Sequence, residues 1–157
     1  MYDKLVVLSE RMRCEKALLG GQVMPESLQQ ALEEGRAEFV ERGGGIIAFG
    51  ALWTRESVVE LGSLWVAQEH RGQKHSSAVF ARLVIRAPVS LRLFLITHEP
   101  HVVHLALKHG LYETARESWV AAIPWSASCG PCDRLVEADK MHCPFRAVSD
   151  ECRLFVR

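Results

Sequence analysis

The sequence has no excess of charge of either sign, no long apolar run and no leader-like N-terminus. Its nineteen basic and nineteen acidic side chains cancel, so no overall field draws the chain to nucleic acid or to an anionic membrane. No apolar stretch approaches the roughly 20 residues that span a bilayer. The first residues, MYDKLVVLSERMR, place charge on both sides of a short apolar patch, unlike a signal peptide. We therefore expect a cytoplasmic protein that binds neither nucleic acid nor membrane, and any anion site must be local.

The composition is that of an ordinary soluble globular protein, with 48% apolar and 24% charged residues. A chain of 157 residues is most simply one domain, 1–157, long enough to bury a core. The five cysteines are an odd number, and four of them lie in a cysteine-rich C-terminal extension, 124–157. This crowding suits metal binding in a reducing compartment better than a disulfide framework.

The N-terminal part of the chain is expected to be helical. Apolar residues recur at helical spacing from Tyr2 to Leu19, and two glycines then supply a stop. A second helix is expected from Pro25 to Arg42, with proline where a first-turn N–H is dispensable and three glycines after the end. Its acidic residues are interpreted as a solvated face: Glu33, Glu34, Glu38 and Glu41.

The middle of the chain is expected to contribute strands. Residues 45–53 and 58–66 are rich in β-branched and aromatic side chains and indicate an antiparallel hairpin. A helix that ends near Arg86 follows, and the nearly continuous apolar run 91–97 then reads as a strand covered on both faces. Strand, crossover helix and strand form a right-handed unit with parallel partners.

The later elements are a helix that Pro100 opens and Gly110 ends, and a final strand over CRLFVR.

The stretch 58–77, VVELGSLWVAQEHRGQKHSS, has the most distinctive pattern: a strand, a basic turn and the polar first turn of a helix. A turn that releases a strand and starts a helix aims several backbone N–H groups at one point, where the helix dipole also favours negative charge. Such a turn can hold a phosphate.

This stretch resembles the signature of the GNAT superfamily of N-acetyltransferases, whose fourth strand ends in Val-x-Pro-x-Tyr-Arg-Gly-x-Gly-x-Gly before a helix. Val66, Arg71 and Gly72 match, whereas Lys74 and Ser76 stand where the signature has its two later glycines. A second, shorter match to Leu-Tyr-x-x-x-Gly-Phe follows in the later helix, so the resemblance covers about residues 45 to 112. It implies an α/β fold: a GNAT-like mixed, mostly antiparallel central sheet flanked by helices, with a parallel splayed strand pair in the middle.

The resemblance also implies acetyl-CoA as co-substrate. In the family the backbone of the fourth strand contacts pantetheine, which here places the acyl arm along Leu64, Trp65 and Val66. The implied pyrophosphate-binding residues are Arg71, Gly72, Gln73, Lys74, His75, Ser76 and Ser77.

Acetyl transfer to an amine requires a held thioester, a base and donors for the developing oxyanion. Glu60 is the candidate base, because it is a carboxylate on an otherwise apolar strand and is expected to share a face with Leu64 and Val66. The alternative is a charge near the hairpin edge, paired with Arg55. The family's general acid, a tyrosine that protonates the leaving thiolate, falls on Ala106, so this role is vacant. Tyr112 is near in sequence but lies past the expected end of the helix, which makes it a weak substitute.

Cysteines of the C-terminal extension predict a structural Zn²⁺ site. A thiolate pair two residues apart can hold one face of a tetrahedral ion, and two further thiolates complete it. His142, beside the third cysteine, could replace one ligand. The predicted ligands are Cys129, Cys132, Cys143 and Cys152.

The first pair of these cysteines also forms Cys-Gly-Pro-Cys, the active-site tetrapeptide of thioredoxin-like proteins. Only a short segment follows it, too short for the rest of that fold, so thiol–disulfide exchange is the lesser interpretation. The third interpretation of these four cysteines is that they are free thiols.

The main hypothesis is an acyltransferase that moves an acetyl group from acetyl-CoA to a primary amine by direct attack. The rivals are a non-catalytic GNAT-like binding module with a structural zinc site and, after it, a thiol–disulfide protein. The sequence does not identify the amine acceptor, and it leaves open whether the protein is a homodimer.

Overall fold

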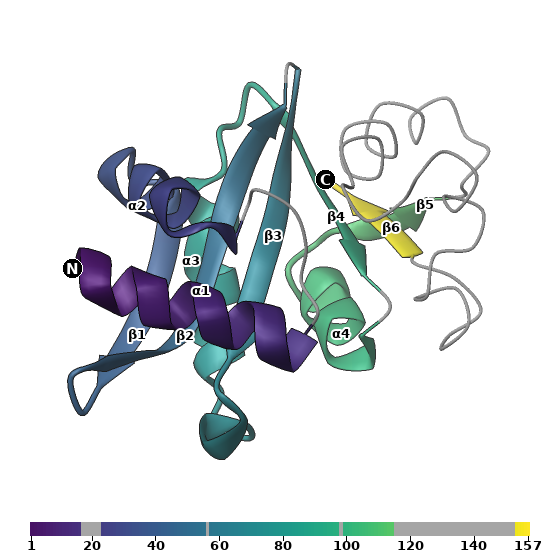
Figure 1. The fold of residues 1–157 in the computed structure, drawn as a ribbon. Helices are drawn as coiled ribbons and strands as arrows, with labels where there is room; N and C mark the ends of the chain where they lie inside the picture. Colours follow the sequence, from purple (N-terminus) through teal and green to yellow (C-terminus); the bar gives the residue numbers. More distant parts are fainter. Residues whose placement is uncertain (17–22, 56, 98, 115–152) are drawn as a thin grey trace, which may run out of the picture. The chain divides into compact units, whose positions relative to one another are not determined.

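The structure is a computed structural model that describes residues 1–16, 23–55, 57–97, 99–114 and 153–157 (Figure 1). Its elements are α1 (Tyr2–Lys16), α2 (Pro25–Glu33), β1 (Ala37–Arg42), β2 (Gly45–Arg55), β3 (Val58–Val66), η2 (Gln68–His70), α3 (His75–Arg86), β4 (Arg92–Thr97), α4 (Pro100–Lys108), β5 (Tyr112–Thr114) and β6 (Arg153–Val156).

The strands form one six-stranded sheet in the order β1-β2-β3-β4-β6-β5. The pairs β1/β2, β4/β6 and β5/β6 are antiparallel, and β3/β4 is parallel. This is the mixed, mostly antiparallel sheet expected from the sequence. The chain divides into two compact units, one of residues 1–53 and 61–87 and the other of 54–60 and 88–157.

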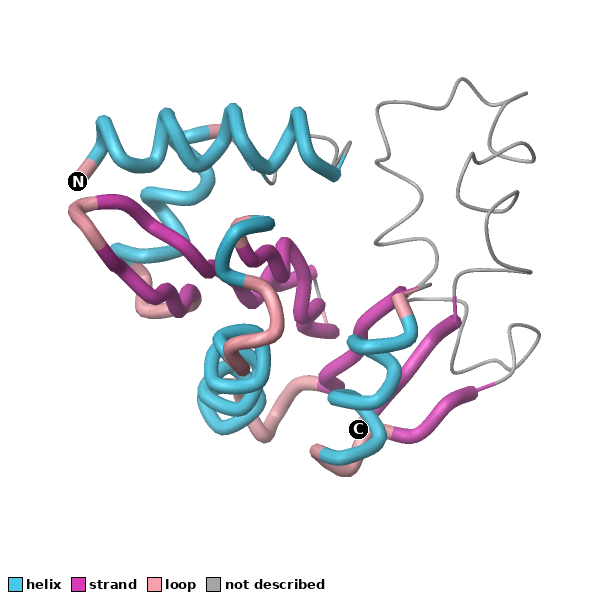
Figure 2. The backbone as a smooth tube through the Cα atoms, turned by 90° about the horizontal axis from the view of Figure 1, so that it is seen from below, coloured by secondary structure: helices cyan, strands magenta, loops and turns pink. Residues whose placement is uncertain are grey.

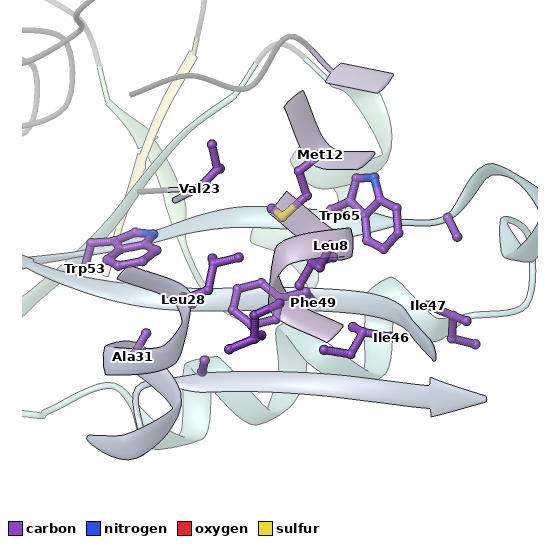
Figure 3. Close-up of a cluster of buried hydrophobic side chains, with 14 residues drawn as sticks. Leu8, Met12, Val23, Leu28, Ala31, Ile46, Ile47, Phe49, Trp53 and Trp65 are labelled. Carbon is purple, nitrogen blue, oxygen red and sulfur yellow. The ribbon is translucent and has the colours of Figure 1, made fainter. Parts of the chain in front are cut away.

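In the first unit, α1 and α2 cover one face of strands β1–β3 and α3 covers the other (Figures 1 and 2). The residues of α1 that repeat at helical spacing, Leu5, Leu8 and Met12, are almost completely buried. They pack with Phe49 of β2 and Trp65 of β3 in one apolar cluster (Figure 3). Each such side chain contributes about 1.5–3 kcal/mol on burial, so this cluster fixes α1 to the sheet.

The predicted second helix is wrong in its second half. Helix α2 ends at Glu33, and Gly35 has a positive φ of 67°. The Gly35 N–H donates to the Leu32 carbonyl and the Arg36 N–H to the Ala31 carbonyl, which together form a Schellman motif. The helix stops here because glycine takes the left-handed conformation at little cost.

The segment Ala37–Arg42, expected as helix, is instead strand β1, paired antiparallel with β2. Glu38 was interpreted as part of a solvated face, and that interpretation is also wrong. Glu38 is only 9% exposed, and its Oε1 atom forms an ion pair with Nη2 of Arg86 in α3 at 2.7 Å. A buried carboxylate requires such a partner.

The second unit is built around β4. Strand β6 pairs with β4 over Phe94–Thr97 and with β5 over Tyr112–Thr114, which confirms the strand expected at the C-terminal end. Val58, Phe94, Leu154 and Val156 form its buried cluster.

The parallel ladder between β3 and β4 is short. It joins Val58–Glu60 to Arg92–Phe94.

None of the helices that the structure describes is long and apolar enough to cross a membrane.

Candidate functional site

The end of β3 supplies the first part of the candidate site. Trp65 is 1% exposed and belongs to the cluster against α1, so it can offer a ligand only its backbone. Leu64 lies on the opposite side, where its Cδ1 is near Gly50 and the side chains of Val79 and Leu83 of α3. For Trp65, this burial is compatible with the backbone contact to an acyl arm that the resemblance implies.

Strand β3 is not regular, because Ser63 has a positive φ of 53°. The Ser63 hydroxyl accepts a hydrogen bond from the Trp53 indole N–H at 3.2 Å. A left-handed residue within a strand interrupts the alternation of side chains. The interruption falls between Glu60 and Leu64, which were expected to share a face of a regular strand.

The turn after β3 is held by short-range hydrogen bonds. The 3-10 helix η2 follows directly, and the Arg71 N–H donates to the Gln68 carbonyl at 3.3 Å. The Arg71 Nε donates to the Val66 carbonyl at 3.2 Å, while the side chain as a whole is exposed. Gly72 follows with a φ of 79°. The Arg71 side chain is therefore exposed but anchored at its Nε atom.

Helix α3 begins in an unusual way, because its N-cap, Lys74, is left-handed, with φ 62° and ψ 12°. Its side chain makes no capping hydrogen bond, and the first turn of α3 carries no acidic residue. The first amides of any helix have no partner within it, and the helix dipole adds partial positive charge. The start of α3, with Arg71 and Lys74 beside it, is suited to an anion.

Two histidines flank this turn, as their places in the sequence require. The rings of His70 and His75 lie edge to face, with centroids 6.4 Å apart, and His75 Nε2 is 3.3 Å from Gln73 Oε1. The His70 Nδ1 atom is buried without a hydrogen-bond partner among the described residues. The ring contact and the contact with Gln73 therefore both lie within the turn itself.

The two candidate catalytic residues differ in burial. Glu60 is 7% exposed and is the last β3 residue in the ladder with β4. Tyr112 is the first residue of β5 and is 58% exposed. Ala106, where the family would have its acid, is completely buried in α4.

The four predicted zinc ligands, Cys129, Cys132, Cys143 and Cys152, lie outside the described residues. Within the described ranges, no group of three or more His, Cys, Asp or Glu side chains could hold a metal ion.

One residue that contacts the segment before the turn was not among the site residues predicted from the sequence. Arg11 of α1 contacts Glu69 of η2 and the ring of Trp65. Its partner carboxylate is 58 residues away in the sequence, and no local pattern points to such a contact.

No family model matches the sequence, and no curated protein matches it. Several solved structures, however, are similar to this chain. Over 99% of this chain and 94% of the other, the protein Rv2747 from Mycobacterium tuberculosis, solved with CoA, matches at a TM-score of 0.63 and 16% identity. An acetyltransferase of the GNAT family from Bacillus cereus matches at 0.59 and 13% identity, over 99% and 90% of the two chains.

N-acetylglutamate synthase from Neisseria gonorrhoeae, solved with CoA and N-acetyl-glutamate, matches at a TM-score of 0.58 and 16% identity over 99% of this chain. This chain spans only 32% of that protein's length. Together with the sheet order, these similarities show that the chain has the fold of the GNAT acetyltransferases.

Proposed function

We propose that this protein is an N-acetyltransferase that binds acetyl-CoA at the turn 71–77 and acetylates a primary amine. The observation that carries the proposal is the left-handed entry into α3 at Lys74, which starts the helix without a side-chain cap next to Arg71. The fold supports it, as do two structures of similar fold that were solved with CoA.

In the proposed reaction the first amides of α3 and Arg71 hold the pyrophosphate, and the backbone of Leu64–Val66 holds the acyl arm. Glu60, directly or through water, takes a proton from the ammonium group of the acceptor. The amine nitrogen then attacks the thioester carbonyl carbon, the C–S bond breaks, and the CoA thiolate leaves. The attacking nitrogen loses its second proton to water as the amide forms, and because Tyr112 is exposed, water is also the proposed proton donor to this thiolate.

The acceptor is proposed only as an amine. Small amines, antibiotics, peptide N-termini and lysines are the classes to test. L-glutamate joins them, because one neighbour of similar fold was solved with N-acetyl-glutamate. Mass spectrometry of each acceptor after incubation with acetyl-CoA identifies the acetylated product.

Calorimetry with acetyl-CoA tests the proposal. We expect saturable binding, weakened about tenfold or more by Arg71→Glu, because the substitution places a negative charge beside the diphosphate. Arg42→Glu is the matched control: it makes the same charge change at an exposed position on β1 and should leave the affinity unchanged. No binding at about millimolar cofactor would favour the non-catalytic module.

We also propose one structural zinc ion on Cys129, Cys132, Cys143 and Cys152, on the strength of their spacing alone. Bound structural zinc contributes on the order of 10 kcal/mol, enough to order a segment short of aliphatic residues. Purified protein should contain about one zinc per chain, and chelation should expose these thiols to titration. Protein that is free of metal, with all thiols already titratable, would refute the site.

A further inference from the structure

Arg11 of α1 joins two segments that come directly before the proposed cofactor turn. Its Nη2 atom lies 3.0 Å from both carboxylate oxygens of Glu69 in η2. Its guanidinium carbon also lies 5.1 Å from the centre of the Trp65 ring in β3. One side chain therefore contacts the strand before the turn and the short helix that opens it.

These contacts bear directly on Arg71. Trp65 is adjacent to Val66, whose carbonyl accepts the hydrogen bond from Arg71 Nε. Glu69 is two residues before Arg71 and belongs to η2, whose first carbonyl accepts the Arg71 N–H. A shift of η2 against β3 would change these two hydrogen bonds, of which the one from Nε helps to orient the Arg71 side chain.

Trp65 gives this arrangement a rigid base, because its ring is buried in the cluster with Leu8 and Met12 of α1 (Figure 3). An isolated surface ion pair is weak, since two mobile side chains must be held in one geometry. Here the cation is already positioned over an aromatic face, an interaction that is itself favourable. The core therefore places the cation of this ion pair, whereas the Glu69 side chain is 56% exposed.

The negative charge of Glu69 also bears on the binding of an anionic cofactor at the turn. The pKa of its carboxyl is lowered by a hydrogen bond from its own backbone and, next, by the hydrogen bond from Arg11. At neutral pH it is a carboxylate two residues before Arg71, and charges act over roughly 8–10 Å at physiological salt. Without a counterion it would repel the cofactor.

We propose that Arg11 is a positioning residue for the cofactor turn: it holds η2 against β3 and neutralises Glu69. The inference rests on the proposed function, because it gives that turn a cofactor to bind. It assigns to α1 a part in cofactor affinity, although α1 supplies no ligand to the cofactor.

The test compares Arg11→Met with a matched variant of the same helix. Lys4→Met also removes an ion pair of α1, with Glu41 at 2.6 Å, and the two partners are 35% and 36% exposed. Its partner lies on β1, away from the turn in sequence and in the sheet order. In calorimetry we expect Arg11→Met to weaken CoA binding about threefold to fivefold, and Lys4→Met to leave it unchanged.

A second pair of variants separates charge from position. Adding Glu69→Gln to Arg11→Met removes the repulsive carboxylate and should recover part of the lost affinity, whereas Arg11→Lys, which keeps the charge, should lose less than Arg11→Met. High salt should reduce the difference between Arg11→Met and the parent protein. Equal affinity in Arg11→Met and the parent, or equal losses in Arg11→Met and Lys4→Met, would overturn the proposal.

Amide hydrogen exchange on the cofactor-free protein provides a readout that does not depend on CoA. We expect faster exchange in residues 67–71 of Arg11→Met and no change there in Lys4→Met. Should the parent protein bind no CoA, the proposed function fails, and exchange still decides whether Arg11 holds the turn. Unchanged exchange in Arg11→Met would show that it does not.

Discussion

At the scale of single residues, Lys74 is the clearest departure from the signature that the sequence resembles. It stands where that signature has glycine, yet it keeps the left-handed backbone of a glycine, with φ 62°. A residue with a Cβ pays for this conformation with about 1–2 kcal/mol. The turn therefore retains the shape that a glycine would give it, while adding a cation to the start of α3.

Replacing Lys74 by glycine should stabilise the protein. We expect Lys74→Gly to be about 1 kcal/mol more stable than Lys74→Ala, because both lose the lysine side chain and only alanine keeps the strain. Urea unfolding followed by circular dichroism measures the difference. Equal stability of the two variants would show that the backbone at this position relaxes without cost.

The same two variants report on the lysine charge. If the ammonium group contacts the diphosphate, both should bind CoA about equally weakly, since both lack it. Tighter binding by Lys74→Gly than by the parent would instead assign the anion to the backbone alone.

At the scale of elements, the packing of α3 on β2 depends on Gly50. A Cβ at this position would lie 2.8 Å from Leu83 Cδ1 and 2.9 Å from Val79 Cγ1. The leucine can change rotamer, but a valine on a helix has one strongly preferred χ1. Gly50→Ala should therefore destabilise the protein by about 1–3 kcal/mol, measured by urea unfolding.

Gly45→Ala is the matched control for Gly50, because it lies on the same strand and the nearest atom to its Cβ would be the Arg42 carbonyl oxygen at 4.0 Å. Its stability should change by less than about 0.5 kcal/mol. If Gly50→Ala cost no more than Gly45→Ala, α3 would have to move easily away from β2.

Strands β5 and β6 are joined by a pH-dependent contact. Arg153 Nε donates to Glu113 Oε1 at 2.6 Å, and this hydrogen bond is the main cause of a lowered pKa of the Glu113 carboxyl. Because the folded pKa is depressed, the pair contributes stability above the usual glutamate range and loses it as pH falls below about 4. Both side chains are 44% exposed, so the contribution is at most about 0.5–1 kcal/mol.

An NMR titration of the Glu113 carboxyl carbon tests this contact. The midpoint should rise in Arg153→Gln, since the hydrogen bonds that favour the carboxylate are lost. The same midpoint in both proteins would show that the pair does not persist in solution. As a control, the pH dependence of unfolding should become flatter in Glu113→Gln.

At the scale of the whole molecule, local sequence signals predicted the elements whose boundaries are local. The hairpin β2–β3, the helix after the basic turn and the final strand were all found near their expected residues. The second helix was overextended because the Gly35 stop was missed and because β1 is defined by pairing with β2, a non-local interaction. Propensity alone cannot report such pairing.

The candidate site was predictable in part for the same reason. The basic turn and the start of α3 are consecutive in the sequence, so the motif located them. The left-handed backbone of Lys74 and Ser63 could not be read from residue type, since neither is glycine. The contact of Arg11 with Glu69 joins segments 58 residues apart, and only the packing of α1 on the sheet brings them together.

Cofactor binding should stabilise the molecule as one cooperative unit. The proposed turn belongs to the first compact unit, but strand β3 is shared: Val58–Glu60 belong to the second unit and Leu61–Val66 to the first. Loss of this shared strand would disrupt both units. We therefore expect one thermal transition, which acetyl-CoA shifts upward as a whole.

The size of that shift follows from the linkage between binding and folding. A ligand at about 100 times its Kd adds about 2.7 kcal/mol to the free energy of unfolding. Differential scanning calorimetry with increasing acetyl-CoA measures it, and Arg71→Glu should abolish most of the shift, while Arg42→Glu keeps it. Two transitions, of which acetyl-CoA moves only one, would contradict the single cooperative unit. They would still locate the cofactor, because the transition that moves would belong to the unit that contains the turn.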